Sequence, residues 1–480
     1  MSKQSDALSS IFNGAAITFV GRLTGAGIGY AGTLIITNLL GPEEFGGFKY
    51  GLSFLSFVTI FSILGLTSGI GRYLRRDDGA EYFTAAVVIG TGTAAILSVV
   101  FFILSPLIAE TLFEEEATPY IQAASIAILP VTLERFAIAT AQAKDKALPG
   151  TLFPDLVRPI TKLAGIAVVV YLGARTYGLA IVIILMMSIG CVGAWLYIWR
   201  LEVNFKRPRI SVIKTLLSFS FPLILSKSVW FAMTNADTIL IGYFRGQTLV
   251  GIYGAAFSTA VLLNMIINSI GSLFLPNVSE LSDAGKIEEF RRVYRTATRW
   301  MLILAVPIAF GLFSFPKIIL SLFGPEFPQG STALMILAVG FLSHIIAGLN
   351  TGALKAFNRT RSIFIYQTIT VICNISLNIF LIPRYGISGA ALATTVSFIL
   401  SNILLNSVLY REAKMAPVEL QTLVSAISAL GIGVLVARNS NIGSVEAAVA
   451  ISCLFAIVWG SSCVLSGLVE IDQIKSFRSN

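Results

Sequence analysis

The sequence predicts an all-α, polytopic membrane protein with about fourteen transmembrane helices. The first observation is composition: hydrophobic residues make up 55% of the 480-residue chain, charged residues only 12%, and the mean hydropathy is +0.83. A soluble domain carries about 25% charged residues, so this chain has too little charged surface to face water on every side. The second observation is that its apolar runs repeatedly reach the roughly 20 residues that cross a hydrocarbon core.

The spans follow one another with short loops between them, which leave no room for a soluble catalytic domain. Because the loops hold no catalytic domain, we expect that the protein is not an enzyme. The first apolar run is longer than a signal-peptide core and lacks a cleavage pattern, so we expect it to be retained as a span. The four cysteines show no metal-ligand spacing, and neither a metal nor a cofactor is expected. In chain order, the predicted spans are 13–40, 47–70, 83–108, 119–141, 151–173, 178–199, 215–241, 249–276, 297–322, 329–354, 363–382, 387–410, 418–437 and 445–468.

Lysines and arginines predict the orientation of these spans. An even number of spans puts both chain ends on one side, and most basic residues fall in alternate loops, so the positive-inside rule makes both ends cytoplasmic in the cell membrane. This distribution accounts for the net charge of +9 without nucleic acid, which is not an expected partner. The basic residues that define the inner side include Arg72, Arg75, Arg76, Lys206, Arg207, Arg209, Lys286, Arg291, Arg292, Arg295, Lys355, Arg359 and Arg361.

An internal repeat groups twelve of the predicted spans into two sets of six. Residues 41–48, shifted by 205 positions, match residues 246–253, because both segments run glycine, four residues, glycine, one residue, aromatic. A shorter match relates residues 177–179 to residues 385–387. Each match falls between corresponding spans of the two sets, which indicates a duplication.

The duplication predicts two pseudo-symmetric six-helix lobes. Because six is even, the halves share one topology and would be related by an axis along the membrane normal. We expect an N-terminal lobe at residues 1–205, a C-terminal lobe at 206–414, and two extra helices with a cytoplasmic tail at 415–480. Two bundles that face each other across a central cavity are typical of transporters that rock one bundle against the other.

Five cations lie deep inside predicted spans, away from the span ends, where each costs about 2.5 kcal/mol or more unless it faces a cavity or a partner. The 205-residue shift places Arg22 on Lys227, so we expect these two to face each other across the central cavity. Arg158 and Lys162 are four residues apart and share one helix face. Together with Arg135, these side chains would lie between the cytoplasmic mouth and the midplane, where they are candidate ligands for a phosphate or diphosphate.

Ordinary alternatives exist for two of these cations. Arg135 could snorkel to the interface beside Glu134, which is the interpretation we favour for that residue, and Arg158 could pair with Asp155. Arg22, Lys162 and Lys227 are too deep for easy snorkelling and favour the cavity.

Four other polar residues are candidates for coupling an ion to transport. They are Asp237 and Asn235 near the outer end of span 215–241, His344 in span 329–354, and Glu134. For Asp237 an interfacial polar residue is the interpretation we favour, and for His344 a hydrogen-bonded contact between helices.

Three stretches, in this order and spacing, carry a resemblance to a known family. Span 13–40 with Arg22 is followed by residues 41–46 and 65–73, then by residues 323–327 and 381–391. Over nearly its whole length the chain resembles the oligosaccharide flippase branch of the multidrug/oligosaccharidyl-lipid/polysaccharide exporter superfamily. The resemblance implies alternating access and a cationic cavity that takes a polyprenyl-linked phosphoryl or pyrophosphoryl sugar to the outer leaflet.

The resemblance also implies partners. A lipid-linked saccharide and membrane lipids are expected, glycan-assembly enzymes are further candidates, and the protein is expected to work as a monomer. In the similar murein-precursor flippases two extra helices form a groove for the lipid tail, and spans 418–437 and 445–468 fit that role.

Two other functions stay open at the level of sequence. A multidrug/cation antiporter of the same superfamily should have buried carboxylates and typically twelve spans, whereas this chain has five buried cations against Glu134 and Asp237. A membrane-embedded sugar polymerase or ligase should carry a catalytic loop on the outer face, and the loops here are short.

Overall fold

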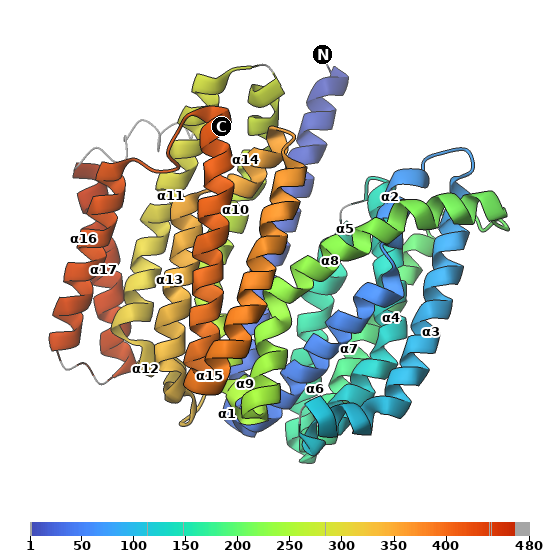
Figure 1. Cartoon of the computed structure of the whole chain (residues 1–480), viewed down its shortest axis with the longest axis horizontal. Coiled ribbons are helices and arrows are strands. Elements are labelled where there is room, and N and C mark those ends of the chain that lie inside the picture. The colour runs from blue at the N-terminus through green and yellow to red at the C-terminus, as the bar shows by residue number, and fades with distance from the viewer. Residues whose placement is uncertain are drawn as a thin grey trace. The chain divides into compact units, whose positions relative to one another are not determined.

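In the computed structural model, the described backbone covers residues 2–112, 114–146, 148–283, 285–440, 442 and 444–465. Within it, side chains are not described at residues 2–23, 26, 112, 222, 225–227, 230, 233–234, 272–280 and 282–283. Over these ranges the chain forms helices and no strand (Figure 1), so the prediction of an all-α fold is confirmed.

The chain folds as two compact units, and the first is Met1–Gly254. Its central helix, α4, packs against α1, α3 and α7 and is buried over most of its length. In chain order the elements are α1 (Ser2–Ile63), α2 (Leu66–Tyr73), α3 (Gly79–Leu112), the 3-10 turn η1 (Glu115–Ala117), α4 (Thr118–Ala143), α5 (Leu148–Thr151), the π-helical segment η2 (Leu152–Val157), α6 (Arg158–Leu172), α7 (Arg175–Trp199), α8 (Ile210–Arg245) and the start of α9 (Gln247–Ala260).

The second unit is Ala255–Asn480. Its last two helices lie against α11, where the Phe455 ring stacks on Phe310 at 4.0 Å and Trp459 Nε1 donates a hydrogen bond to the Ile303 carbonyl. After α9, the elements are α10 (Leu262–Asp283), α11 (Ile287–Ser314), α12 (Pro316–Ser321), the 3-10 turn η3 (Phe327–Gly330), α13 (Ser331–Ala347), α14 (Asn350–Ala356), α15 (Thr360–Ala413), α16 (Leu420–Asn439) and α17 (Val445–Leu465).

Ten stretches of the described helices are long and apolar enough to cross a membrane, which makes this a multi-pass membrane protein. Two of these long helices are interrupted by a residue with non-helical dihedral angles, α1 at Gly41 and α15 at Gly386. Both breaks lie where two predicted spans adjoin. The total of fourteen spans stays a prediction. The predicted lobe boundaries also stay predictions, and the compact units divide at a different place, after residue 254.

Large apolar side chains cover the exposed faces of several helices, as an apolar solvent requires. On α3, Val88 and Ile103 are 62% and 69% exposed, and only a small share of this helix is buried. Aliphatic side chains exposed in such numbers would be unfavourable in water and are favourable against lipid tails. The outer side of α3 is therefore a lipid-facing surface.

The two glycine turns of the repeat adopt the same backbone conformation. Gly41 has φ 83° and ψ 179°, and Gly246 has φ 87° and ψ 171°. Residues with a Cβ rarely occupy this region, so each turn requires glycine at its first position. The matching angles support the duplication that the sequence pattern indicates.

These two turns also pack against each other, in a reciprocal way. A Cβ on Gly46 would lie 2.0 Å from the carbonyl oxygen of Gln247, and a Cβ on Gly251 would lie 1.9 Å from that of Pro42. The 205-residue shift carries Gly46 onto Gly251 and relates Pro42 to Gln247. The two contacts are therefore equivalent under the repeat, each glycine meeting a carbonyl oxygen of the other turn. The matched turns therefore make a local two-fold contact that only glycine allows.

Candidate functional site

Two of the five predicted cations cannot be placed. The helices that carry Arg22 and Lys227, α1 and α8, are described, but both side chains lie outside the described residues. Their convergence on a central cavity stays a prediction.

Arg158 forms a buried ion pair with Glu134. Arg158 is the first residue of α6, and its guanidinium, 14% exposed, contacts the fully buried carboxylate that α4 provides. The sequence analysis placed Glu134 beside Arg135 and offered Asp155 as the partner of Arg158, so this pairing was not predicted. A cation held by a buried carboxylate contributes little free positive charge.

The ion pair leaves one polar atom of each side chain without a hydrogen bond. Among the described residues, Glu134 Oε1 and Arg158 Nε have no hydrogen-bond partner although both atoms are buried. Arg135 is exposed, and the charged groups that act on it are Arg158, Glu134 and Asp155. Two guanidinium groups therefore sit among two carboxylates, and this part of unit 1 is close to neutral.

Lys162 lies one helical turn beyond Arg158 and has a different environment. Its Nζ donates a hydrogen bond to Thr33 Oγ1 on α1 at 3.3 Å and lies 5.8 Å from the Phe48 ring centroid. The charge that acts on Lys162 is a second ammonium group, that of Lys49, rather than a carboxylate. Within the described part of the chain neither lysine forms an ion pair, so no acidic group compensates the charge of these two residues, which we call the lysine pair.

Lys49 is the site residue that sequence reasoning missed, because it lies at the edge of the predicted span 47–70, beside an outer loop. The chain restarts as helix at Pro42, directly after the break at Gly41, since proline is favourable at the first helical position. Lys49 therefore lies two turns inside the second half of α1, with its Nζ 5.4 Å from the Phe45 ring. The proline after the turn glycine was the signal that could have placed it.

Close packing of α1 on the π-helical segment positions Lys162. A Cβ on Gly25 would lie 1.6 Å from the carbonyl oxygen of Asp155, so the two backbones touch here. The segment η2 begins at Leu152 and ends just before Arg158, and it contacts both α1 and α7. A wider helical turn at this place sets the direction in which α6 starts, and Lys162 then reaches Thr33.

The polar residues of α8 bind to neighbouring helices of unit 1. The Tyr253 hydroxyl donates to Asp237 Oδ2 at 2.5 Å, and Ser53 Oγ donates to Asn235 Oδ1 at 3.3 Å. Asp237 and Asn235 therefore take part in contacts between helices, and a role in coupling an ion stays a prediction.

In unit 2, His344 belongs to a polar network between α13 and α15. Its Nδ1 lies 3.0 Å from Asn402 Oδ1, and Asn402 Nδ2 donates to Ser343 Oγ. A second buried cluster, which sequence reasoning missed, joins Asn374 to Asn378 at 3.1 Å. The spacing of these two asparagines, four residues apart in one span, was the available signal.

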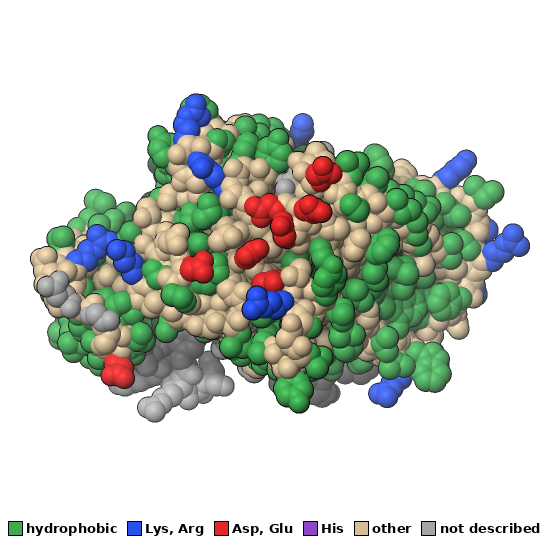
Figure 2. Space-filling view, turned by 90° about the horizontal axis from the view of Figure 1, so that it is seen from below, with side chains coloured by type: hydrophobic (Ala, Val, Ile, Leu, Met, Phe, Trp, Pro, Cys, Tyr) green, Lys and Arg blue, Asp and Glu red, His purple; other side chains and the backbone are tan. Residues whose placement is uncertain are grey.

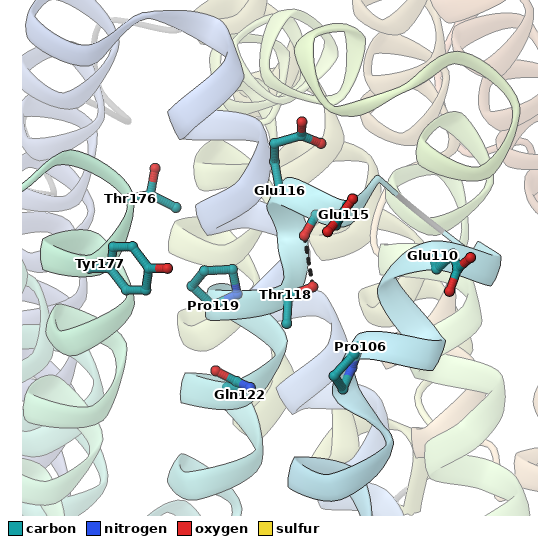
Figure 3. Close-up of a pocket in the computed structure, with 9 residues that line it drawn as sticks. All are labelled: Pro106, Glu110, Glu115, Glu116, Thr118, Pro119, Gln122, Thr176 and Tyr177. Atoms are coloured by element: carbon teal, nitrogen blue, oxygen red, sulfur yellow. Dashed lines mark hydrogen bonds between the residues drawn. The ribbon is translucent and has the colours of Figure 1, made fainter.

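A pocket opens at the end of unit 1 that lies opposite the basic loops. It has a volume of about 860 Å³, lies between the ends of α3, α4 and α7, and is shown in Figure 3. Acidic side chains gather on this face of the molecule (Figure 2). The lining residues are Pro106, Glu110, Glu115, Glu116, Thr118, Pro119, Gln122, Thr176 and Tyr177.

The sequence of this chain matches a known protein family over more than half of its length. Residues 35–330 match the family model described as "Polysaccharide biosynthesis protein", which is more than half of the chain. The chain belongs to this family of polysaccharide flippases, within the multidrug/oligosaccharidyl-lipid/polysaccharide exporter superfamily.

Relatives of this family member include two proteins of Haloferax volcanii. One, a "Probable low-salt glycan biosynthesis flippase Agl15", is 24% identical over 392 residues, which cover 80% of each chain. The other, a "Probable flippase AglR", is 26% identical over 434 residues, which cover 88% of this chain and 87% of the relative.

Solved structures show the same fold for this polysaccharide flippase family member. The "Lipid II flippase MurJ, inward closed conformation" aligns with a TM-score of 0.78 and 16% identity, over 95% of this chain and all of the other. An inward-facing multidrug resistance MATE family transporter aligns with a TM-score of 0.64 and 13% identity, over 88% of this chain. The predicted resemblance to the superfamily is confirmed.

Proposed function

We propose that this protein is a flippase that moves a polyprenyl-(pyro)phosphate-linked oligosaccharide from the cytoplasmic to the outer leaflet by alternating access. The lysine pair carries the proposal: Lys49 lies within a candidate membrane span, Lys162 lies on α6, where the charge of Lys49 acts on it, and no described carboxylate compensates either group. The names of the Haloferax relatives, both called flippases, support the same conclusion.

The physical reason concerns the cost of buried charge. Two ammonium groups in a medium of low dielectric repel each other and lose hydration, so their site is unfavourable while it is empty. A phosphate or diphosphate headgroup would supply the missing negative charge through charge-assisted hydrogen bonds. A site of this kind selects an anionic lipid headgroup and disfavours a cationic drug.

The other cations have different parts in this proposal. Arg22 and Lys227 are proposed to extend the anion site from the two lobes, as the 205-residue shift suggests. Arg135 would meet the headgroup at the mouth. Arg158 is neutralised by Glu134, so we propose that it contributes only when that pair opens.

Of the ion-coupling candidates, Glu134 fits that role best. Its Oε1 is buried without a described partner, and protonation of the carboxylate would release Arg158 toward the headgroup. By contrast, Asp237, Asn235 and His344 are already engaged in contacts between helices.

Transport of a fluorescent short-chain polyprenyl diphosphate sugar by proteoliposomes tests the proposal. A membrane-impermeant quencher reaches only the labelled lipid in the outer leaflet of the liposomes. For the native protein, this quenched fraction should change with time as lipid is moved between the leaflets. It should stay constant for the double variant Lys49→Gln/Lys162→Gln. The control is Lys317→Gln, which removes an exposed lysine of α12.

Two results would contradict the proposal. One is a double variant that transports the lipid as fast as the native protein. The other is uptake of a cationic dye in exchange for protons with no movement of the lipid, which would favour the antiporter function.

A further inference from the structure

The pocket opposite the basic loops has no part in the headgroup site, although its walls belong to the same unit. Its volume of about 860 Å³ lies within the range of ligand-binding clefts, roughly 300–1,000 Å³. Three different helices contribute to it, α3 with Pro106, α4 with Thr118 and Pro119, and α7 with Tyr177, and the turn η1 adds two glutamates (Figure 3).

The lining combines flat apolar surfaces with groups that donate and accept hydrogen bonds. The Tyr177 side chain, 72% exposed, extends toward Pro119, and Pro106 lies on the other side of the start of α4 (Figure 3). Gln122 can both donate and accept hydrogen bonds, as can the threonine hydroxyls, and the glutamates accept them. An aromatic face beside paired donors and acceptors suits a ring with C–H groups on its faces and hydroxyls on its edge.

The charge of the lining excludes two other ligand classes. Glu110, Glu115 and Glu116 would repel phosphate, so this is not a second headgroup site. In the described part of the chain no three acidic, histidine or cysteine side chains converge as metal ligands, which argues against a metal-ion site. What fits the pocket is an uncharged, hydroxyl-rich molecule.

The wall of the pocket is held in place by the partly buried carboxylate of Glu44. Thr176 Oγ1 donates to Glu44 Oε1 at 2.8 Å, and the Tyr120 hydroxyl donates to Glu44 Oε2 at 2.5 Å. Glu44 belongs to the glycine turn of α1, so the start of α7 is fixed to the place where the two repeat turns meet. The pocket is therefore formed before any ligand binds, which lowers the entropic cost of binding.

We infer that this pocket binds the saccharide part of the transported lipid at the outer side, and that it selects uncharged sugars over uronic acids. The identity of the cargo rests on the proposed function, but binding of free sugar does not require transport. The lysine pair would hold the phosphate group and this pocket the glycan, so the two sites divide the cargo by charge.

The test uses the full-length protein in detergent and a panel of free oligosaccharides. The panel contains maltotriose, mannotriose and triacetylchitotriose as neutral members and a hyaluronan tetrasaccharide as the acidic member, and ligand-observed NMR measures binding. At least one neutral sugar should bind, and Tyr177→Ala should weaken its binding on the order of tenfold through loss of the aromatic face. Tyr385→Ala is the matched control, because Tyr385 is the exposed tyrosine at the corresponding turn of the second repeat.

The inference is overturned if no neutral sugar binds, if only the acidic sugar binds, or if Tyr177→Ala and the native protein bind alike. These results leave the proposed function intact as long as lipid transport still depends on the lysine pair. If neutral sugars bind at the pocket and the native protein moves no lipid, the proposed function fails and the saccharide site stands.

Discussion

At the scale of the residue, the two kinds of partly buried cation in unit 1 differ in what compensates their charge. Arg158 has a carboxylate partner, whereas Lys162 faces a hydroxyl and a second lysine. The sequence identified Arg158, Lys162 and Glu134 as unusual because each is charged within an apolar run. It could not distinguish their roles, because a partner on another helix depends on how the helices pack.

Replacement of Glu134 by glutamine should destabilise the protein by about 3–5 kcal/mol, the cost of leaving one member of a buried pair uncompensated. The double variant Glu134→Gln/Arg158→Met removes both charges and should recover much of this loss. Thermal unfolding in detergent, followed by intrinsic fluorescence, measures both effects. Equal stability of Glu134→Gln and the native protein would show that the ion pair is not formed.

At the scale of the element, the sequence predicts where a helix is interrupted but not where it becomes π-helical. The break at Gly41 could be placed because glycine followed by proline ends one helix and starts the next. The π-helical segment Leu152–Val157 has no comparable signal. It lies where the backbone of α1 touches Asp155, and this contact forms only when the helices have packed.

The contact between the two repeat turns predicts that adding one methyl group, at Gly46, destabilises the protein. Gly46→Ala would place a Cβ about 2.0 Å from the Gln247 carbonyl oxygen, so the two turns must separate, at a cost of about 1–3 kcal/mol. The midpoint of thermal unfolding should fall by a few degrees. Gly92→Ala is the matched control, because no atom lies within 4 Å of its added Cβ and alanine favours a helix. An unchanged midpoint for Gly46→Ala would mean that the turns do not touch.

At the scale of the whole molecule, composition and the repeat predict the fold class and the duplication. They do not predict where the two compact units divide. The matched turns, which the sequence places in different lobes, lie together in unit 1, so the compact unit extends past the predicted boundary at residue 205. A sequence repeat records duplication of the chain, whereas a compact unit records which helices touch.

The orientation of the protein can be tested with single cysteines at the two ends of unit 1. Glu116→Cys, in the pocket, should react with a membrane-impermeant maleimide on intact cells, and Arg75→Cys, in a basic loop, only after the cells are opened. The native protein, with its four cysteines, measures the background. The reverse pattern of labelling would invert the topology and the direction of transport.

The central claim is that Lys49 and Lys162 bind an anionic lipid headgroup, and the affinity of the purified protein for geranylgeranyl diphosphate measures this most directly. Calorimetry should show that Lys49→Gln/Lys162→Gln weakens binding on the order of 100-fold, since each lost charge-assisted contact costs about 1.5–3 kcal/mol. Lys49→Arg/Lys162→Arg should retain most of the affinity. Equal affinities of the native protein and the glutamine variant would contradict the account.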